Sequence, residues 1–264
     1  MSNESNGIRF DDGEAYERYM GVWSRLAGVE FLDWLAPAPG LRWLDVGCGN
    51  GAFTTLIADR CAPASVAGID PAPAQLTFAR TRPWPCPVEF REGNAMALPF
   101  AADAFDVAVM PLVIFFVPDP AAGVLEMARV VRPGGCVCAY SWDLTGGGFP
   151  YELPQQELRA LGVPVPEPPS KHAGSLEQQP GLWRSAGLVD LHTREITVTR
   201  TFESFDDYWA TLLGGPSLQR PFASLTPNAR HTLQARLRER LPADANGRIT
   251  YSARATAIAG RVPR

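Results

Sequence analysis

The sequence is poor in lysine and histidine, and it has no excess of positive charge. Lys171 is the only lysine among 24 basic residues, and the 264 residues carry a formal net charge of −4. Nucleic acids are bound largely through their phosphates, which attract basic surfaces, so this charge balance predicts no nucleic-acid partner. We interpret the preference for arginine as a bias of composition and not as a phosphate site.

Cysteine is scarce and follows no metal-binding pattern. The five cysteines are Cys48, Cys61, Cys86, Cys136 and Cys138, an odd number without any Cys-x-x-Cys pair. This spacing argues against a disulfide framework and against a zinc site. We therefore expect no metal, and reduced thiols in a cytoplasmic protein.

Long apolar segments are missing as well. The longest apolar run, residues 107–117, contains a proline and is too short to span a bilayer. The first twelve residues are polar and acidic, unlike a signal peptide, and we expect residues 1–14 to be disordered. The sequence predicts no membrane partner, while 46% hydrophobic residues suffice for a substantial core.

The most informative stretch is Leu44-Asp45-Val46-Gly47-Cys48-Gly49-Asn50-Gly51. An apolar run, residues 41–46, leads into it, and residues 52–58 follow with helical spacing, which predicts a strand, a glycine-rich turn and a helix. Three glycines in five residues allow a sharp turn and a close approach of the backbone to a ligand. The amides at the start of the helix then face that ligand.

Asp45 restricts which ligand this turn can accept. It lies two residues before the first glycine, and the spacing is Gly-x-Gly-x-Gly, whereas dinucleotide-binding turns use Gly-x-Gly-x-x-Gly. A carboxylate repels a pyrophosphate but attracts an ammonium group, and the attraction is strengthened at reduced dielectric. S-adenosylmethionine, a nucleoside with an amino acid and a sulfonium, fits this requirement.

On these residues the sequence resembles the class I S-adenosylmethionine-dependent methyltransferases, whose first motif is similar to residues 44–51. The likeness covers roughly residues 15–142 and says little about residues 143–264. It implies that S-adenosylmethionine is the cofactor and S-adenosylhomocysteine the product. An NAD-dependent oxidoreductase is the alternative enzyme, disfavoured by Asp45 and by the glycine spacing.

The chain as a whole predicts an α/β protein with a doubly wound, Rossmann-like sheet. Strands are expected near residues 41–46, 65–70, 88–92, 105–110 and 136–141, with helices between them. By the resemblance, residues 189–201 and 249–260 add an antiparallel pair, which makes seven strands in the same domain as the core at 15–142. We expect segments 143–180 and 202–247 to form a helical cap over the site.

The resemblance also implies a set of cofactor-binding residues. Candidates at the strand ends and turns are Asp45, Gly47, Cys48, Gly49, Asp70, Pro71, Gln75, Asn94, Ala95, Met96, Pro111 and Leu112. Asp70 is expected on the ribose hydroxyls, or, alternatively, as a cap of the next helix. Near the N-terminus the candidates are Tyr19, Met20, Trp23 and Arg25. Either these residues contact the cofactor, or the first three pack in the core and Arg25 faces solvent.

The sequence gives fewer signals about the acceptor site. The apolar loop at residues 111–117 suggests an acceptor with an aromatic or apolar body, and Phe116, Tyr140, Trp142 and Asp143 are expected to line its pocket. His172 is the best-placed candidate for a general base. We expect O- or N-methylation of a small molecule, and the alternative is a cofactor-binding partner protein without catalysis. The sequence leaves the choice between monomer and homodimer open.

Overall fold

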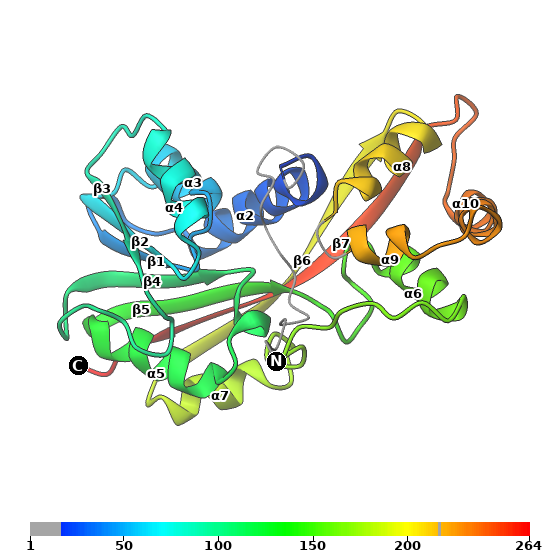
Figure 1. Ribbon diagram of the computed structural model, residues 1–264. Helices are drawn as coiled ribbons and strands as arrows, with labels where there is room; N and C mark the ends of the chain where they lie inside the picture. Colours follow the sequence, from blue (N-terminus) through cyan, green and yellow to red (C-terminus); the bar gives the residue numbers. More distant parts are fainter. Residues whose placement is uncertain (1–16, 216–217) are drawn as a thin grey trace, which may run out of the picture.

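The computed structural model describes residues 17–215 and 218–264, so the disorder expected for residues 1–14 lies outside the described residues. The described chain forms one seven-stranded sheet with the strand order β3-β2-β1-β4-β5-β7-β6 (Figure 1). Strands β1 to β5 pair in parallel, and β7 is antiparallel to both of its neighbours. The predicted fold class is confirmed. The strands are β1 (Arg42–Val46), β2 (Ser65–Asp70), β3 (Val88–Glu92), β4 (Phe105–Pro111), β5 (Val131–Trp142), β6 (Val189–Phe202) and β7 (Ile249–Arg261).

Helices cover both faces of the sheet. Figure 1 shows α2 (Val22–Leu35), α3 (Ala52–Arg60) and α4 (Pro73–Thr81) on one face, and α5 (Pro120–Val130) and α7 (Gln179–Ser185) on the other. The central strands β1, β4 and β5 are therefore buried on both sides, which explains their nearly continuous apolar sequences. Helix α5 begins as predicted, because the Asp119 side chain accepts a hydrogen bond from the Ala122 amide at 3.1 Å.

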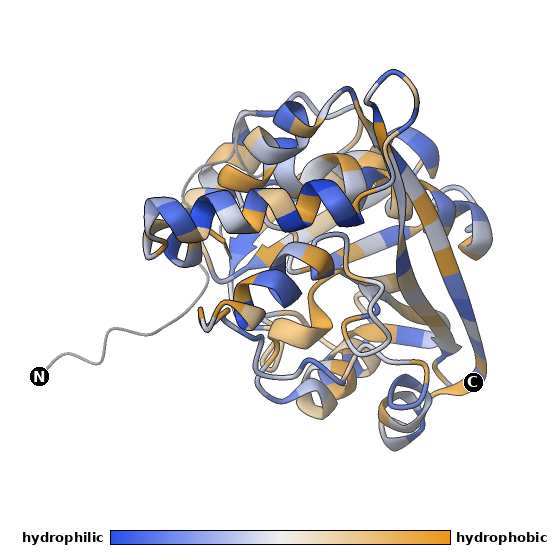
Figure 2. Cartoon of the chain, turned by 90° about the vertical axis from the view of Figure 1, so that its right-hand side faces the viewer, coloured by the Kyte–Doolittle hydropathy of each residue, from blue (hydrophilic) through white to orange (hydrophobic). Residues whose placement is uncertain are grey.

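The two last strands extend beyond the rest of the sheet. Their extended ends carry α8 (Phe205–Leu213), α9 (Gln219–Ala223) and α10 (Pro227–Arg240), with α6 (Glu152–Ala160) packed against α10 (Figure 1). We call α6 and α8–α10 the lobe. Figure 2 looks onto α10 and shows polar residues over most of this helix, while Leu233 and Leu237 are its buried residues.

Several boundaries differ from the expectation. Residues 131–135 belong to β5 and not to a turn before it, since Phe105 pairs with Val131 across an irregularity in the β4–β5 register. The π-helical turn η1 (Glu17–Gly21), the 3-10 turn η2 (Ile114–Phe116) and the short α9 were not predicted. No helix within the described ranges has the length and apolarity needed to cross a bilayer.

The segment 143–180 divides between two places in the fold, and its role as part of a cap over the site stays a prediction. Its first part contributes α6 to the lobe, but its last part packs on the core: Ser170 donates from its amide to the Phe115 carbonyl at 3.1 Å and from its hydroxyl to the Val117 carbonyl at 2.8 Å. Helix α7 follows and lies against α5, and the Trp183 indole donates to the Val137 carbonyl. A buried aromatic side chain with a paired N–H thus holds this segment to the sheet.

Candidate cofactor and acceptor site

The glycine-rich turn has the geometry that its sequence predicts. Gly47, Gly49 and Gly51 have φ values of 79°, 52° and 81°, which side chains other than glycine rarely adopt. A Cβ atom on Gly47 would lie 2.5 Å from the Val113 side chain, whereas a Cβ on Gly49 would meet nothing closer than the Gln75 amide oxygen at 4.0 Å. Gly47 therefore allows the turn to pack against Val113 at the β4 tip. Gly49 has open space beside its backbone, which a ligand can approach.

Cys48 lies inside this turn and is buried. Burial, with the nearby Asp45 and Asp70 carboxylates, raises the pKa of the Cys48 thiol far above its ordinary value. The thiol therefore stays protonated and is no nucleophile.

Asp45 is completely buried below the turn. Its Oδ2 accepts a hydrogen bond of 2.6 Å from the Thr54 hydroxyl, while its Oδ1 has no hydrogen-bond partner among the described residues. Burial raises the pKa of Asp45 to about 7, against the lowering effect of the Thr54 hydrogen bond. A buried carboxylate with one unpaired oxygen is costly as an anion, and a nearby cation would offset that cost. The site thus fits a cationic ligand.

Asp70 links two backbone segments at the edge of the site. Its Oδ2 accepts from the Gly49 amide at 2.9 Å and its Oδ1 accepts from the Ala72 amide at 2.8 Å. Burial raises the pKa of Asp70, while both amide hydrogen bonds oppose the shift. Ala72 is itself the N-cap residue of α4, which has no side-chain cap, so Asp70 holds the turn before this helix and does not cap the helix as the alternative expected. Each carboxylate oxygen can accept a further hydrogen bond, so ribose binding stays a prediction.

The next segment forms a small turn after β3. The Asn94 side-chain oxygen accepts from the Met96 amide at 2.9 Å, and Ala95 and Met96 pack partly buried beside the core on the α5 face of the sheet. Pro71 is exposed and Gln75 is half-buried on the neighbouring segment. Contact of these residues with adenine stays a prediction.

The tip of β4 has a strained backbone. Leu112 has a φ of 59°, which is uncommon for a residue with a side chain, and its amide donates to the Tyr140 carbonyl at 2.7 Å. This conformation follows the buried Pro111 and precedes Val113, which packs over Gly47. Such strain persists where the surroundings impose it, often at functional sites. Phe116, farther along the loop, is 37% exposed.

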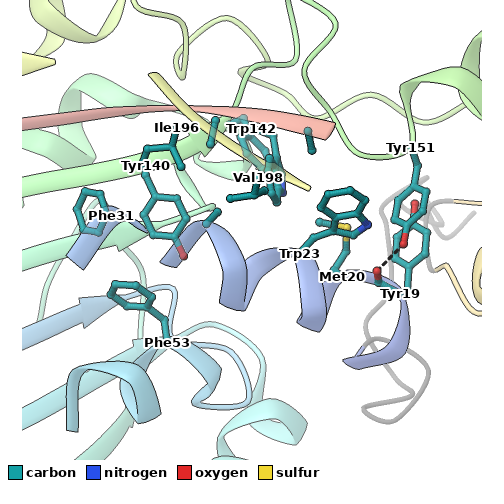
Figure 3. Packing of buried hydrophobic residues seen from close by; sticks show 14 of the residues in the cluster. Tyr19, Met20, Trp23, Phe31, Phe53, Tyr140, Trp142, Tyr151, Ile196 and Val198 are labelled. Atoms are coloured by element: carbon teal, nitrogen blue, oxygen red, sulfur yellow. Dashed lines mark hydrogen bonds between the residues drawn. The ribbon is translucent and has the colours of Figure 1, made fainter. Parts of the chain in front are cut away.

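The N-terminal candidates lie in the hydrophobic core. Tyr19, Met20 and Trp23 are buried, and the Tyr19 ring stacks on Tyr151 with a centroid distance of 4.1 Å (Figure 3). The Tyr19 carbonyl also accepts a 2.6 Å hydrogen bond from the Tyr151 hydroxyl. These contacts favour the packing alternative over a cover for the cofactor. Arg25 is exposed, and no ion pair is found for it within the described residues.

Two acceptor candidates, Tyr140 and Asp143, make contacts within the protein, and their contact with an acceptor stays a prediction. The Tyr140 ring packs in the core between Phe31 and Phe53, at centroid distances of 4.8 and 5.5 Å (Figure 3). The Asp143 carboxylate pairs with Arg254 at 2.6 Å and accepts from the Gly146 amide at 2.7 Å. Asp143 therefore fixes the glycine-rich turn after β5.

Trp142 and His172 remain candidates for contact with an acceptor. Trp142 is buried, and its indole N–H has no hydrogen-bond partner among the described residues. His172 is exposed and lies two residues after Ser170, which is hydrogen-bonded to the loop at the β4 tip. The structure thus brings the His172 turn next to the expected acceptor loop.

Two residues of this site were missed from the sequence. Thr54 was hidden in the helix after the turn, although a polar residue buried one turn after Gly51 could have indicated a partner for Asp45. Val113 gave no signal, because its contact with Gly47 depends on the left-handed backbone at Leu112.

Comparisons with known proteins agree with this geometry. A family model described as a methyltransferase domain matches residues 44–139. A 2-phytyl-1,4-naphtoquinone methyltransferase from Thermosynechococcus vestitus is 31% identical over 166 residues, which are 62% of this chain and 70% of the relative. An uncharacterized protein from Mycobacterium tuberculosis is 36% identical over 108 residues, 41% of this chain, and the match spans only 39% of that relative.

Among solved structures, phosphoethanolamine N-methyltransferase 2 from Haemonchus contortus has a similar fold. Its TM-score is 0.58 at 18% identity, over 95% of this chain and 57% of that chain, and it was solved with phosphomonomethylethanolamine and S-adenosylhomocysteine. At this identity the likeness concerns the fold alone. The strand order, the glycine turn with its buried acid, the family match and the relative from Thermosynechococcus together show that the chain belongs to the class I S-adenosylmethionine-dependent methyltransferases.

Proposed function

We propose that this chain binds S-adenosylmethionine and transfers its methyl group to an oxygen or nitrogen of a small molecule. The observation on which this mainly rests is the buried Asp45, whose unpaired Oδ1 and raised pKa suit a ligand with an ammonium group. The open backbone at Gly49, next to Asp70, offers a second contact surface. When bound, the sulfonium would supply an already activated methyl group.

The chain's own contribution would be mainly positional. Asp45 would hold the ammonium group of the amino-acid end, Asp70 the ribose, and the Asn94–Met96 turn the adenine. Holding donor and acceptor at attack distance can lower a barrier by about 7–11 kcal/mol, which is enough without a strong base. The apolar β4 loop would exclude water from the reacting atoms. Where the acceptor must lose a proton, His172 is the proposed base, worth roughly 10²–10⁴-fold.

The relatives support a small acceptor with an apolar or aromatic body. The relative from Thermosynechococcus is named for a phytyl-naphthoquinone, and another, 37% identical over 105 residues from Lysinibacillus sphaericus, is named a demethylmenaquinone methyltransferase. The apolar residues 111–117 at the β4 tip are consistent with such a body. A cytoplasmic location and the lack of a nucleic-acid or membrane partner stay predictions, and we make no choice between monomer and homodimer.

Thermal unfolding with and without S-adenosylmethionine tests the cofactor part of the proposal. Ligand at 100 times its dissociation constant adds about 2.7 kcal/mol of stability. Asp70→Ala should remove most of this gain, while Glu89→Gln, an exposed acid on β3, should leave it intact. A panel of small phenols and amines with methyl-labelled cofactor then tests transfer. Unchanged cofactor stabilisation in Asp70→Ala would show that the nucleoside binds elsewhere.

A further inference from the structure

Aromatic side chains from seven segments meet where the lobe joins the core. We call them the junction cluster; its members are Tyr19, Trp23, Trp142, Tyr151, Phe202, Tyr208 and Tyr251. Trp23 and Tyr251 are 5.2 Å apart between ring centroids, and Phe202 lies 5.2 Å from Tyr208 and 5.9 Å from Tyr251. Figure 3 shows Tyr19, Trp23, Trp142 and Tyr151 in this region, with the Trp142 indole above α2.

The cluster contains polar groups that the protein itself does not satisfy. The indole N–H of Trp142 and the hydroxyl of Tyr251 are both buried and have no hydrogen-bond partner among the described residues. Buried donors are nearly always paired, and each unpaired one is costly. With the indole N–H of Trp23, which is also buried and unpaired among the described residues, three such groups within one aromatic cluster offer polar contacts to a ligand.

The position of Trp142 connects the cluster with the proposed reaction site. The last pair between β4 and β5 joins Pro111 to Tyr140, so Trp142 lies two residues beyond the tip of β4. It is on the same face of β5 as Tyr140, whose ring contacts Phe53 of α3, the helix that begins at the glycine turn. A molecule against Trp142 would therefore lie at the edge of the sheet where the methyl group is expected.

The charge in the cluster restricts the ligand. Arg200 stacks on Phe202, with 4.3 Å from its guanidinium carbon to the ring centroid, and donates to the Arg18 and Tyr19 carbonyls at 3.1 and 3.3 Å. Burial raises the pKa of the Tyr151 and Tyr251 hydroxyls, and the positive charge of Arg200 opposes this shift. The neighbouring Asp143 is already paired with Arg254. No ion pair is found for Arg200 within the described residues, so its charge disfavours a cationic ligand, and the unpaired indole N–H of Trp142 can donate to a hydrogen-bond acceptor.

We propose that the junction cluster is the acceptor site and that it selects an oxygen-bearing aromatic molecule over an aliphatic or aromatic amine in its ammonium form. The oxygen of the acceptor receives a hydrogen bond from the Trp142 indole, the Tyr251 hydroxyl makes a second polar contact, and the ring packs among the aromatic side chains. This inference rests on the proposed methyl transfer, because it assigns the acceptor of that same reaction.

The closed cluster can admit such a molecule by a local separation of its two sides. On one side are Tyr19 and Trp23 of the N-terminal turn and α2, and on the other are Tyr151 and the lobe. The hydrogen bonds joining these sides include those from Tyr151 and Arg200 to the Arg18 and Tyr19 carbonyls. Each such bond has a small net effect on stability, but separating the two sides also uncovers buried aromatic rings, so the incoming ring must replace the packing that is lost.

The test compares three probes of similar shape in calorimetric titrations of the full chain, in the presence of S-adenosylhomocysteine. The probes are 1-naphthol, 1-methylnaphthalene and 1-naphthylmethylammonium. Wild-type protein should bind 1-naphthol roughly 3- to 10-fold more tightly than 1-methylnaphthalene, as expected for one hydrogen bond, and should bind the ammonium probe most weakly. Trp142→Phe should abolish the preference for 1-naphthol, and Tyr251→Phe should reduce it.

Trp43→Phe is the matched control. Trp43 is also fully buried with an unpaired indole N–H, but it lies near the start of β1, at the opposite end of the sheet. The preference for 1-naphthol should persist in Trp43→Phe, and the affinity for S-adenosylhomocysteine should be unchanged in all three variants.

Three results would overturn the assignment: equal binding of the two neutral probes, tighter binding of the ammonium probe, or no probe binding to a protein that binds S-adenosylhomocysteine. A preference for 1-naphthol that survives in Trp142→Phe would also overturn it. Failure of S-adenosylhomocysteine to bind, with a preference that still depends on Trp142, would instead reject the proposed methyl transfer and leave an aromatic binding site.

Discussion

Replacing Asp45 by asparagine should make the ligand-free protein more stable while weakening its hold on the cofactor. The pKa of Asp45 rises from 3.8 to about 7 on burial, a shift of about three units. Each unit corresponds to about 1.36 kcal/mol, so the ionised carboxylate costs the folded state on the order of 4 kcal/mol above pH 7. The introduced asparagine would keep an oxygen for the Thr54 hydroxyl. It would also bury an unpaired amide NH₂ group, which lowers the gain in unfolding free energy by about 1–3 kcal/mol.

The sign and the pH window follow from the raised pKa. The folded state holds its proton up to about pH 7, whereas the unfolded chain releases it near pH 4, so stability from this group is complete below pH 4 and is lost as pH rises to 7. Between pH 5 and pH 8 the loss amounts to about 2.5 kcal/mol. The difference in unfolding free energy between Asp45→Asn and wild type should grow by that amount over this interval, whatever the fixed cost of the amide.

Urea denaturation at pH 5, 6, 7 and 8 measures this difference, and titration with S-adenosylmethionine in the same buffers measures the second half of the prediction. If the ionised form of Asp45 binds the cofactor, affinity in wild type should fall about tenfold for each pH unit below 7, and the dependence should vanish in Asp45→Asn. Parallel stability curves for the two proteins, or a cofactor affinity independent of pH in wild type, would refute the reasoning.

Three further predictions concern packing and charge. Gly47→Ala places a Cβ at positive φ and 2.5 Å from Val113, and should cost more than about 2 kcal/mol by urea denaturation, whereas Gly49→Ala has open space and should cost about 1 kcal/mol while weakening cofactor binding. Burial raises the pKa of Asp106, but hydrogen bonds from Arg42 and Arg132 outweigh burial and hold this pKa well below its usual range. Asp106→Asn should therefore lower the unfolding free energy by about 1–2 kcal/mol at pH 7 and by much less near pH 2. Equal losses at both pH values would contradict this. Glu157→Ala removes the carboxylate that pairs with arginines of α10, so amide hydrogen exchange should rise in α6 and α10 but not in β1; uniform change across the chain would count against a local role.

The core of the fold could be predicted because each of its elements follows from local sequence. Strands at residues 65–70 and 88–92 were placed with their observed ends, since apolar runs bounded by turn residues have few alternative structures. The start of α5 followed from an aspartate cap and a proline at its first position. These signals depend on neighbours in sequence, so they are visible without tertiary information.

The acceptor side could not be predicted as well, because its contacts join residues far apart in the chain. Tyr140 and Trp142 lie on the same face of β5. The Tyr140 ring nevertheless packs against α2 and α3, while Trp142 lies beyond the tip of β4. The ion pair of Asp143 could not be predicted because its partner, Arg254, lies 111 positions later in the chain. For Tyr19 the sequence left open a cover for the cofactor or a place in the core, because its contacts with Tyr151 and Gly215 join distant segments; a Cβ on Gly215 would lie 2.6 Å from the Tyr19 ring.

The lobe and the cofactor-binding core share one hydrophobic core, and this has a consequence for how the acceptor site can change. Trp43 of β1, Trp23 of α2 and Leu233 and Leu237 of α10 belong to a single cluster of buried residues. A lobe without a separate core cannot fold as an independent unit, and here α8 packs against β6 and η1 while the Tyr208 ring contacts Tyr251 of β7. Substitutions that enlarge or reshape the acceptor site in this cluster therefore remove packing that also supports the sheet. We expect acceptor preference and global stability to change together in such variants. Substitutions at Asp70 or Gly49, which lie at the open turn, should instead alter cofactor affinity with a smaller effect on folding.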